Sequence, residues 1–407
     1  MTADSGRDRI QWADGQMPVL RSIRERFARE RPLAGLVVGA CLHVTSETAI
    51  LVRTLRAGGA EVALCASNPF ATQDDVAAAL AADHGAEVHA VHGEDAAAWG
   101  EHVAAVVARA PQITLDDGAD LLGALHAGRP DLLERVLGGT EETTTGLVRL
   151  RAMEAEGILA CPVIAVNEAR AERAFNDRFG TGQSVLDGIL RTTNLMLAGQ
   201  TVVVLGYGWT GRGVALRAHG LGASVIVCEV DPLRALEARM EGFAVMPALD
   251  AAEHGDVFIT VTGGRDVLRA EHFARMRDGA VLANAGHFDV EISLEDLHAA
   301  AAGVREVRPL VTQYDLGGRR LNLLAAGRVV NLAAAEGHPA GVMDVSFALQ
   351  ALAAELLARE PGAREAGVHP VPEEIEREVA TLKLAALGVD IDALTDEQAA
   401  YLSRWRT

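Results

Sequence analysis

The stretch Thr201–Glu229, TVVVLGYGWTGRGVALRAHGLGASVIVCE, decides how the chain is interpreted. An apolar, β-branched run is followed by Gly206, Gly208 and Gly211 in a G-x-G-x-x-G pattern. A helix-like segment and a second apolar run then lead to Glu229. Glycines at this spacing permit a tight turn, a close approach of backbone to a pyrophosphate, and close packing of helix on strand. The stretch therefore predicts a Rossmann-type dinucleotide site.

Two charged residues at the end of this stretch bear on the choice of cofactor. An acidic residue about 20 positions beyond the turn binds the ribose 2′-hydroxyl of NAD, and Glu229 has that position. Arg234, a few residues on, is the one feature that would suit the 2′-phosphate of NADP. We expect NAD as the cofactor.

Composition limits the class of protein. A length of 407 residues suits about two domains, and 49% hydrophobic residues can bury a large core. The net charge of −19 argues against nucleic acid or an anionic membrane as a partner. The polar, charged N-terminus predicts no secretory signal, and no uncharged apolar run reaches about 18 residues, so we expect no membrane-spanning helix.

The four cysteines predict neither a disulfide framework nor a metal site. Cys41, Cys65, Cys161 and Cys228 are far apart, without C-x-x-C or metal-like spacing. We expect reduced thiols, a cytoplasmic location and no bound metal.

Strand-like and helix-like segments alternate through most of the chain, which is typical of parallel sheets with helices on both faces. The predicted strands are Leu36–Val38, Val62–Cys65, Val88–Val91, Ile113–Leu115, Ala244–Met246, Val257–Thr262 and Ala280–Ala283. Residues 1–31 and 342–357 are predicted helical, 361–372 a loop, and 373–407 a helix, a break and a second helix. The predicted fold class is α/β, with two doubly wound parallel-sheet domains, the second a Rossmann NAD-binding domain.

Polar clusters follow several of the predicted strands. They include His43 and Glu47 after the first strand, Gln73 after the second, Asp117 after the fourth, and the run Glu141–Thr145. Each alone has a structural explanation, since Asp and Thr commonly cap helices. Ligands in such sheets bind beyond the C-terminal ends of the strands, so together these side chains predict a site there.

The motifs in these clusters resemble those of the S-adenosylhomocysteine hydrolase family along nearly the whole chain. The matching segments are CLHVTSETA, TQDDVAAAL, LDDGADL, EETTTG, GYGWTGRG, EVDP, NAGHFDVEI, RVVNLAA and EGHPAGVMD. The segment GTGQS, the Trp209 variant and the ending YLSRWRT resemble the shorter bacterial and archaeal branch. The resemblance implies a nucleoside domain of residues 1–180 plus 340–390, an NAD domain of 181–339 and a helical tail of 391–407.

The resemblance also implies a reaction. Tightly held NAD transiently oxidises the 3′-hydroxyl of an adenine nucleoside, the adjacent 4′ proton leaves, and the 5′ substituent is eliminated. The implied catalytic residues are His43 and Asp117 as the acid/base pair, with Glu142 and His287. Glu172 and Asn176 occupy two further catalytic positions of the family and are candidates on that ground. The implied substrate-binding residues are Thr45, Glu47, Gln73, His338, Met343 and Phe347. The implied cofactor-binding residues are Thr143, Thr144, Thr145, Asp177, Gly206, Gly208, Gly211, Glu229, Asn284 and Asn331.

The resemblance fails within NEARAERAFNDRFG, residues 167–180. The family carries a catalytic Lys and Asp here, which hold the ribose hydroxyls, whereas this chain has Glu172 and Asn176. On a helix these residues lie one turn apart and can contact one ligand. Glu172 could act as a base if burial raised its pKa, while Arg170 or Arg173 would be poor proton acceptors.

Three functions remain open from the sequence. We favour a dehydratase that eliminates a hydroxyl from a modified adenine nucleoside, because both members of one sugar-binding pair have changed. The first alternative is an authentic S-adenosylhomocysteine hydrolase, giving adenosine and homocysteine. The second is a catalytically inactive protein that binds NAD and a nucleoside. In each case we expect a homo-oligomer, a dimer or tetramer, with an adenine nucleoside or its 5′-thioether as ligand.

Overall fold

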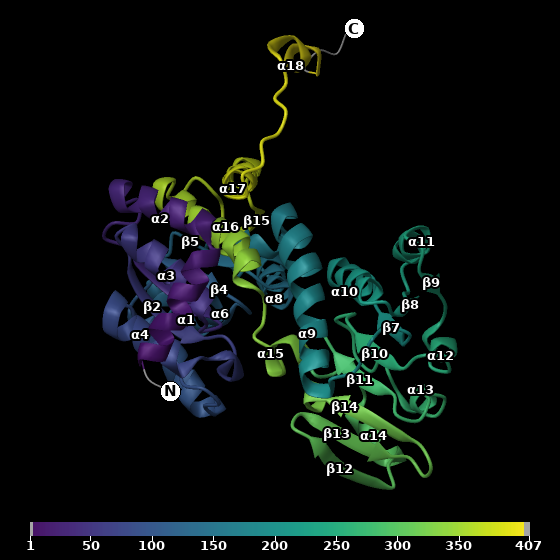
Figure 1. The fold of residues 1–407 in the computed structure, drawn as a ribbon. Coiled ribbons are helices and arrows are strands. Elements are labelled where there is room, and N and C mark those ends of the chain that lie inside the picture. Colours follow the sequence, from purple (N-terminus) through teal and green to yellow (C-terminus); the bar gives the residue numbers. More distant parts are fainter. Residues whose placement is uncertain (1–2, 403–407) are drawn as a thin grey trace.

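The protein is described from a computed structural model that covers residues 3–402, and it contains two separate β-sheets (Figure 1). The strands of the first sheet are β1 (Val37–Leu42), β2 (Glu61–Ala66), β3 (Glu87–His89), β4 (Ile113–Asp116), β5 (Gly138–Glu141), β6 (Pro162–Ala165) and β15 (Gly367–Pro370). They lie in the order β15-β6-β5-β4-β1-β2-β3, and every pairing is parallel.

Helices cover the first sheet on both sides. They are α1 (Ala3–Gln16), α2 (Pro18–Glu30), α3 (Ser46–Ala57), η1 (Pro69–Ala71), α4 (Asp74–His84), α5 (Ala96–Ala108), α6 (Asp120–Gly128), α7 (Pro130–Leu133), α8 (Thr144–Ala155), η2 (Val166–Glu168) and α16 (Ala340–Arg359). Helix α16 therefore returns to the first sheet from late in the sequence, and β15 follows it there.

The second sheet has parallel and antiparallel parts. Its strands are β7 (Thr201–Leu205), β8 (Ser224–Cys228), β9 (Ala244–Val245), β10 (Val257–Thr260), β11 (Val281–Asn284), β12 (Gly303–Arg308), β13 (Val311–Asp315) and β14 (Arg320–Leu324). Its helices are α10 (Trp209–Gly220), α11 (Pro232–Met240), α12 (Ala248–Ala251), α13 (Ala270–Phe273), α14 (Leu294–Ala300) and η4 (Ala325–Gly327). The order is β12-β13-β14-β11-β10-β7-β8-β9, and β12, β13 and β14 pair antiparallel.

Both sheets contain the same parallel strand order, 3-2-1-4-5, when the strands are counted from β1 in the first sheet and from β7 in the second. In this doubly wound arrangement the chain changes direction beside the first strand, which leaves a crevice between strands 1 and 4. The crevices lie between β1 and β4 in the first sheet and between β7 and β10 in the second. These two switch points are where ligand sites are expected.

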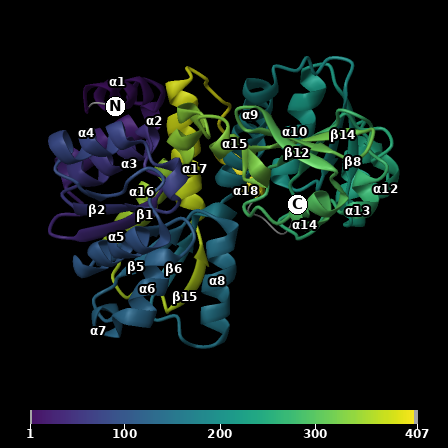
Figure 2. The same ribbon diagram turned by 90° about the horizontal axis from the view of Figure 1, so that it is seen from below.

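Two segments connect the sheets. The outgoing connection is a π-helix, η3 (Glu172–Thr181), continued by α9 (Gly182–Thr193), and the returning one contains α15 (Val330–Ala333). Figure 2 shows the two sheet units side by side with α9 and α15 between them. The strands of the first sheet lie within residues 37–165 and 367–370 and those of the second within 201–324, and the predicted domain division stays a prediction.

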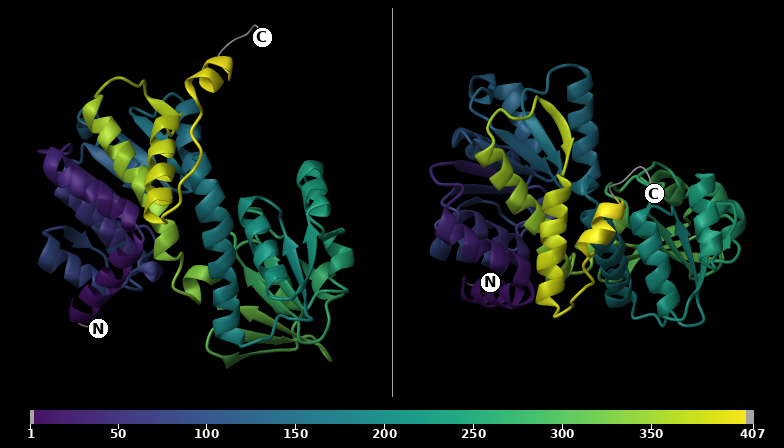
Figure 3. Two further views of the ribbon diagram at one scale, coloured as in Figure 1. Left: turned by 45° about the horizontal axis from the view of Figure 1, so that its top comes forward. Right: turned by 90° about the horizontal axis from the view of Figure 1, so that it is seen from above.

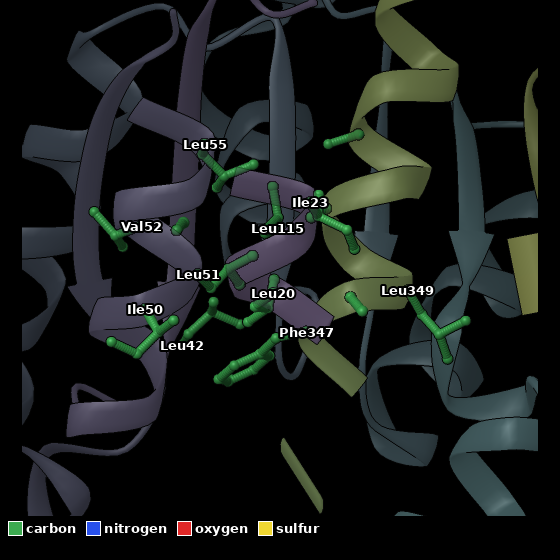
Figure 4. Close-up of a cluster of buried hydrophobic side chains, with 14 of the residues drawn as sticks. Leu20, Ile23, Leu42, Ile50, Leu51, Val52, Leu55, Leu115, Phe347 and Leu349 are labelled. Atoms are coloured by element: carbon green, nitrogen blue, oxygen red, sulfur yellow. The ribbon is translucent and has the colours of Figure 1, made fainter. Parts of the chain in front are cut away.

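The core of the first unit is packed around α3 and α16 (Figure 4). Leu20 and Ile23 of α2, Leu51 and Leu55 of α3 and Phe347 of α16 are all at most 3% exposed. Helix α16 is the one helix in residues 3–402 that is long and apolar enough to cross a membrane by length and composition, and 78% of that stretch is buried inside the protein. Because this helix contains Asp344, Glu355 and Arg359, it is not an uncharged apolar run, and the expectation of no membrane-spanning helix stays a prediction.

Several predicted elements differ in the structure. Residues 3–30 form two helices because Pro18 begins α2, and proline is favoured at the first position of a helix. Residues 367–370 of the predicted loop form β15, which pairs with β6. The predicted α/β fold with two doubly wound parallel-sheet domains is confirmed. The antiparallel strands β12 and β13 were not predicted, since all six residues of β12 are exposed and carry no apolar alternation.

The C-terminal segment contains α17 (Glu373–Ala386) and α18 (Asp396–Leu402), so the predicted helix, break and helix is confirmed up to residue 402. Figure 3 shows α18 standing away from the body of the molecule. Residues 403–407, the end of the YLSRWRT motif, lie outside the described residues, as do residues 1–2 of the predicted N-terminal helix.

Candidate active site

His43 and Asp117 meet at the switch point of the first sheet. His43 follows β1 and Asp117 follows β4, and these strands are neighbours, so the two side chains converge. His43 Nε2 lies 3.3 Å from Asp117 Oδ2. The Ser67 hydroxyl is 3.1 Å from His43 Nδ1 and donates to Asp117 Oδ2 at 3.2 Å. Sequence reasoning missed Ser67, although its place directly after β2 was the available signal.

A second polar group lies across the cavity on η3 and α16. Glu172 and Asn176 are buried, and the Asn176 amide and the Ser346 hydroxyl both donate hydrogen bonds to the Glu172 carboxylate. Gln350, one turn after Ser346 on α16, donates to Glu142 Oε2 at 2.6 Å. Neither Ser346 nor Gln350 was predicted, because each lies in a helix whose apolar composition indicated only core packing.

The π-helical geometry of η3 explains why this group converges. A π-helix has i→i+5 hydrogen bonds and a wider turn than an α-helix, and such turns are frequent at functional sites. Residues four and five positions apart can therefore face the same side, and Glu172, Asn176 and Asp177 all line the cavity.

Burial raises the pKa of these carboxyl groups. The pKa of Glu172 is raised to about 8, chiefly by burial and further by Asp177, against the hydrogen bonds from Ser346 and Asn176. Burial also raises the pKa of Asp177 to about 6. The pKa of Glu142 is raised well above its usual value by burial and then by Asp117 and Glu172. Carboxyl groups whose pKa values are displaced toward neutrality are candidates for proton transfer.

The opposite end of the cavity is formed by α3, the segment before α16, and α16 itself. Thr45 caps α3, and Glu47 Oε1 accepts a hydrogen bond of 3.0 Å from Ser46. Met343 and Phe347 supply apolar walls. Gln73 lies outside the inner cavity, in an adjoining hollow that shares Glu47, Glu336, Gly337 and His338 with it.

His338 is held in its neutral form. Burial lowers its pKa to about 4, and its Nε2 atom is hydrogen-bonded to the Thr181 hydroxyl at 2.9 Å. His287, from the loop after β11, also lines the cavity, and its pKa is lowered by burial and by His43, while Asp117 opposes this. His338 from the returning connection and His287 from the second sheet unit therefore both lie near the His43–Asp117 pair.

Together these residues enclose a cavity of about 190 Å³. The side chains predicted for catalysis or substrate binding that line it are His43, Thr45, Glu47, Asp117, Glu142, Glu172, Asn176, His287, His338, Met343 and Phe347. Asn176 Oδ1 and Asn331 Oδ1 are buried there without a hydrogen-bond partner. Buried acceptors of this kind indicate a polar ligand.

A groove of about 960 Å³ lies at the switch point of the second sheet. Gly206 has φ +105°, and a Cβ on Gly211 would lie 2.0 Å from the Gly206 carbonyl oxygen, so the turn requires glycine at both positions. Gly208 and Glu229, which were predicted to bind the cofactor, line this groove. The Glu229 carboxylate accepts hydrogen bonds from the backbone of Tyr207 at 2.6 Å and of Asp231 at 3.0 Å. This glycine cradle fits the pyrophosphate and ribose of NAD.

The groove and the cavity adjoin. Asn167 and Asp177 line both, and Thr144 lines the groove while Thr143 lines the cavity. Helix α10 approaches η3 closely, since a Cβ on Gly213 would lie 1.8 Å from the Arg178 carbonyl oxygen. Sequence reasoning missed this role of Gly213, whose signal was the G-R-G spacing.

Besides Thr143, three further predicted cofactor residues lie outside the groove. Thr145 lines neither space, and Asn331 faces the nucleoside cavity. Asn284 is fully buried, and its amide bonds the carbonyl groups of Gly286, Phe288 and Gly327. In this structure Asn284 orders the loop that carries His287, so any contact with NAD stays a prediction.

Comparison with known proteins finds two matching family descriptions. The description "S-adenosyl-L-homocysteine hydrolase, NAD binding domain" matches residues 177–337, and "S-adenosyl-L-homocysteine hydrolase" matches residues 1–132. The chain belongs to the S-adenosylhomocysteine hydrolase family. It is an NAD-dependent enzyme of that family, and NAD is its cofactor.

The similar proteins extend over nearly the full chain. An adenosylhomocysteinase of Aquifex aeolicus is 58% identical over 404 residues, covering 99% of this chain and 97% of its own. An S-inosyl-L-homocysteine hydrolase of Methanopyrus kandleri is 54% identical over 405 residues, covering 99% and 95%. These names give no support to the favoured dehydratase, and they fit the hydrolase alternative better.

A solved structure supports the fold alone. The crystal structure of a dipicolinate synthase chain from Bacillus halodurans has a TM-score of 0.53 and 15% identity, over 80% of this chain and 99% of that chain.

Proposed function

We propose that this enzyme hydrolyses S-adenosylhomocysteine to adenosine and homocysteine. The observation that carries the proposal is the cavity that contains the His43–Asp117 pair and adjoins the dinucleotide groove at Asn167 and Asp177. A nucleoside in that cavity would have its sugar between the acid/base pair and the cofactor.

Each part of the chain then has a defined task. Bound NAD would supply a hydride acceptor, so that a sugar hydroxyl can be oxidised to a ketone. The ketone would make the neighbouring C–H bond acidic. His43 and Asp117 would remove the 4′ proton and protonate the departing sulfur. Asn176 and Asn331 offer buried acceptors for sugar hydroxyls.

The base is proposed to be adenine because of Glu47. A carboxylate accepts hydrogen bonds, and the adenine amino group donates them. Hypoxanthine presents a carbonyl at that position, so two acceptors would face one another, and buried unpaired acceptors cost about 1–3 kcal/mol. S-inosylhomocysteine is the second candidate, because relatives 54% identical to this chain bear the name of its hydrolase.

The test is to incubate the purified holoenzyme separately with S-adenosylhomocysteine, S-inosylhomocysteine and adenosine, and to measure products by mass spectrometry. Adenosine and homocysteine from the first substrate support the proposal. If homocysteine forms only from S-inosylhomocysteine, the nucleobase that the enzyme recognises is hypoxanthine and not adenine. Loss of water from adenosine without turnover of either thioether would reject the hydrolase in favour of a dehydratase.

The remaining context is proposed with the function. Cys41, Cys65, Cys161 and Cys228 are free and buried, which agrees with a reducing, cytoplasmic setting. We expect a homo-oligomer, a dimer or tetramer, which light scattering would measure, and a small-molecule ligand with no nucleic acid or membrane partner.

A further inference from the structure

The nucleoside cavity is rich in carboxyl groups and has no basic side chain from lysine or arginine. Among the described residues that line it, the acidic ones are Glu47, Asp117, Glu142, Glu172, Asp177 and Glu336, and none is Lys or Arg. Oxidation of a sugar hydroxyl releases a proton as well as a hydride, so some group in this cavity must take that proton.

No lysine of this chain can do so. Lys383 is the single lysine in the sequence, and its ammonium group lies on α17, 2.9 Å from both Asp344 Oδ2 and the Gly341 carbonyl. Arg173 lines the dinucleotide groove and pairs with Glu168 at 3.6 Å. Arg170 is exposed, and a guanidinium group is a poor proton acceptor in any case.

We propose that Glu172 is the catalytic residue that accepts the proton of the sugar hydroxyl during its oxidation and returns it when the ketone is reduced. Ser346 and Asn176 act as positioning residues for its carboxylate. This inference rests on the proposed NAD-dependent oxidation of a nucleoside. The inference gives Glu172 the role of proton acceptor, a role that the sequence comparison does not decide.

The position of Glu172 supports this role. Its side chain is only 1% exposed, lines the cavity, and is held from two directions by the Ser346 hydroxyl and the Asn176 amide. Glu172 begins the helix that carries Asp177, which lines both cavity and groove. A sugar CH–OH group between Glu172 and the dinucleotide groove could therefore lose its hydroxyl proton to one side and the hydride of its C–H bond to the other.

The charged groups around Glu172 come from several elements. Asp177 lies on η3 itself and Glu142 follows β5, and both carboxyl groups interact with Glu172, while Asp117 after β4 lines the same cavity. His338 enters from the α15–α16 connection and is neutral near pH 7.

The other elements packed against η3 add no cation to the cavity. Helix α16 contributes the uncharged Ser346 and Gln350. Helix α10 contributes Arg212, which pairs with Glu241, and Arg217, which lies over the Phe179 ring. Burial and negative neighbours therefore dominate, and the pKa of Glu172 is raised to about 8. A base is most effective when its pKa is near the working pH.

The atoms and electrons of the step balance. The O–H proton passes to a Glu172 carboxylate oxygen, the hydrogen on the same carbon leaves as hydride to NAD⁺, and a C=O bond forms. The carbon is oxidised by two electrons and the cofactor is reduced by two. In the closing step the protonated Glu172 returns its proton to the oxygen as the carbon regains a hydride.

The test uses the NAD-loaded protein and its Glu172→Gln variant. Each is mixed with adenosine in a stopped-flow instrument, and the rate of cofactor reduction is followed by absorbance between about pH 6 and 10. We expect the wild-type rate to rise with pH and level off above about 8, because only the ionised carboxyl group accepts a proton. Glu172→Gln should be about 100-fold slower or more, without that inflection.

Two further measurements separate catalysis from structure. In the cofactor-free protein, the infrared band of a protonated carboxyl group should disappear as the pH rises through about 8, and Glu172→Gln should lack this change. Ser346→Ala should move the inflection of the rate to higher pH, because it removes a hydrogen bond that stabilises the carboxylate. The matched control is Glu355→Gln, a buried glutamate farther along α16 that pairs with Arg26 and Arg359 and should reduce cofactor at the wild-type rate.

The outcomes distinguish this inference from the proposed function. If the wild type cleaves S-adenosylhomocysteine and Glu172→Gln reduces cofactor at the wild-type rate, the base is another group and the inference is wrong. If adenosine reduces the cofactor only when Glu172 is present but no thioether is cleaved, the inference stands and the function is wrong. If no nucleoside reduces the cofactor of the wild type, both are rejected.

Discussion

The two switch points of this molecule have the same strand order but are built from different parts of the chain. At the second sheet, the crevice between β7 and β10 is formed by backbone, with glycines at positions where a Cβ would collide. At the first sheet, the crevice between β1 and β4 is formed by side chains, with His43 and Asp117 joined through Ser67. A backbone site specifies its ligand over one short stretch, whereas a side-chain site depends on segments far apart in sequence.

The difference extends to electrostatics. The dinucleotide groove uses the acidic Glu229 to bind backbone amides, so its charge is compensated locally. The nucleoside cavity contains buried carboxyl groups with raised pKa values, and Glu142 and Glu172 are satisfied only by residues of α16 and η3. Cofactor binding should therefore tolerate changes of pH better than catalysis does.

The largest expected effect tests the backbone site. In Gly211→Val the new Cβ would meet the Gly206 carbonyl oxygen, so the turn cannot keep its shape. We expect NAD affinity to fall on the order of a thousandfold, about 4 kcal/mol, measured by calorimetric titration of the cofactor-free protein. Gly220→Ala, at the end of the same helix and with open space around it, is the control and should bind normally.

The next effect tests the side-chain site. Asp117→Asn removes the carboxylate that faces His43, so thioether cleavage should fall about 100-fold while adenosine still reduces the cofactor. Product analysis and cofactor absorbance measure the two steps separately. Asp120→Asn, a nearby acid paired with Arg149, should stay within about threefold of wild type. Equal losses in both variants would mean that Asp117 acts only on local structure.

A smaller effect appears in the pH dependence of stability. The pKa of His338 is lowered by burial to about 4 in the folded protein, against about 6.5 when unfolded. As the pH falls below about 6.5, the unfolded chain gains a proton that the folded chain does not, so this residue favours unfolding. Between pH 7 and 5 the wild type should lose about 2 kcal/mol more free energy of unfolding than His338→Asn. Urea titrations at both pH values measure the free energy of unfolding. The same change between pH 7 and 5 in both proteins would contradict the prediction.

The smallest effect concerns recognition of the nucleobase. Glu47→Gln replaces an acceptor by an amide that can also donate, so the ratio of kcat/KM for S-adenosylhomocysteine over S-inosylhomocysteine should fall about tenfold. Glu336→Gln, another carboxyl group at the edge of the cavity, should leave that ratio unchanged. An unchanged ratio in Glu47→Gln would remove Glu47 from base recognition.

Sequence reasoning predicted a ligand site at each sheet, but not which groups donate hydrogen bonds to the side chains there. Alternating apolar segments predicted the parallel strands, and the polar residues that follow β1 and β4 predicted the place where His43 and Asp117 meet. The antiparallel β12 and β13 were missed because an exposed edge strand needs no apolar alternation. Ser346 and Gln350 were missed because helical periodicity shows which face is buried, not which polar group receives a hydrogen bond there.

The sequence alone determined the cofactor and the family, because a glycine turn and long ordered motifs are local features whose physical demands are met within a few residues. Only the tertiary structure decided the proton affinity of the Glu172 carboxyl group. Its burial, its contacts with α16 and the absence of any nearby lysine among the described residues depend on a helix more than 150 positions away in the chain returning to the first sheet. A side chain's proton affinity follows from what surrounds it in space.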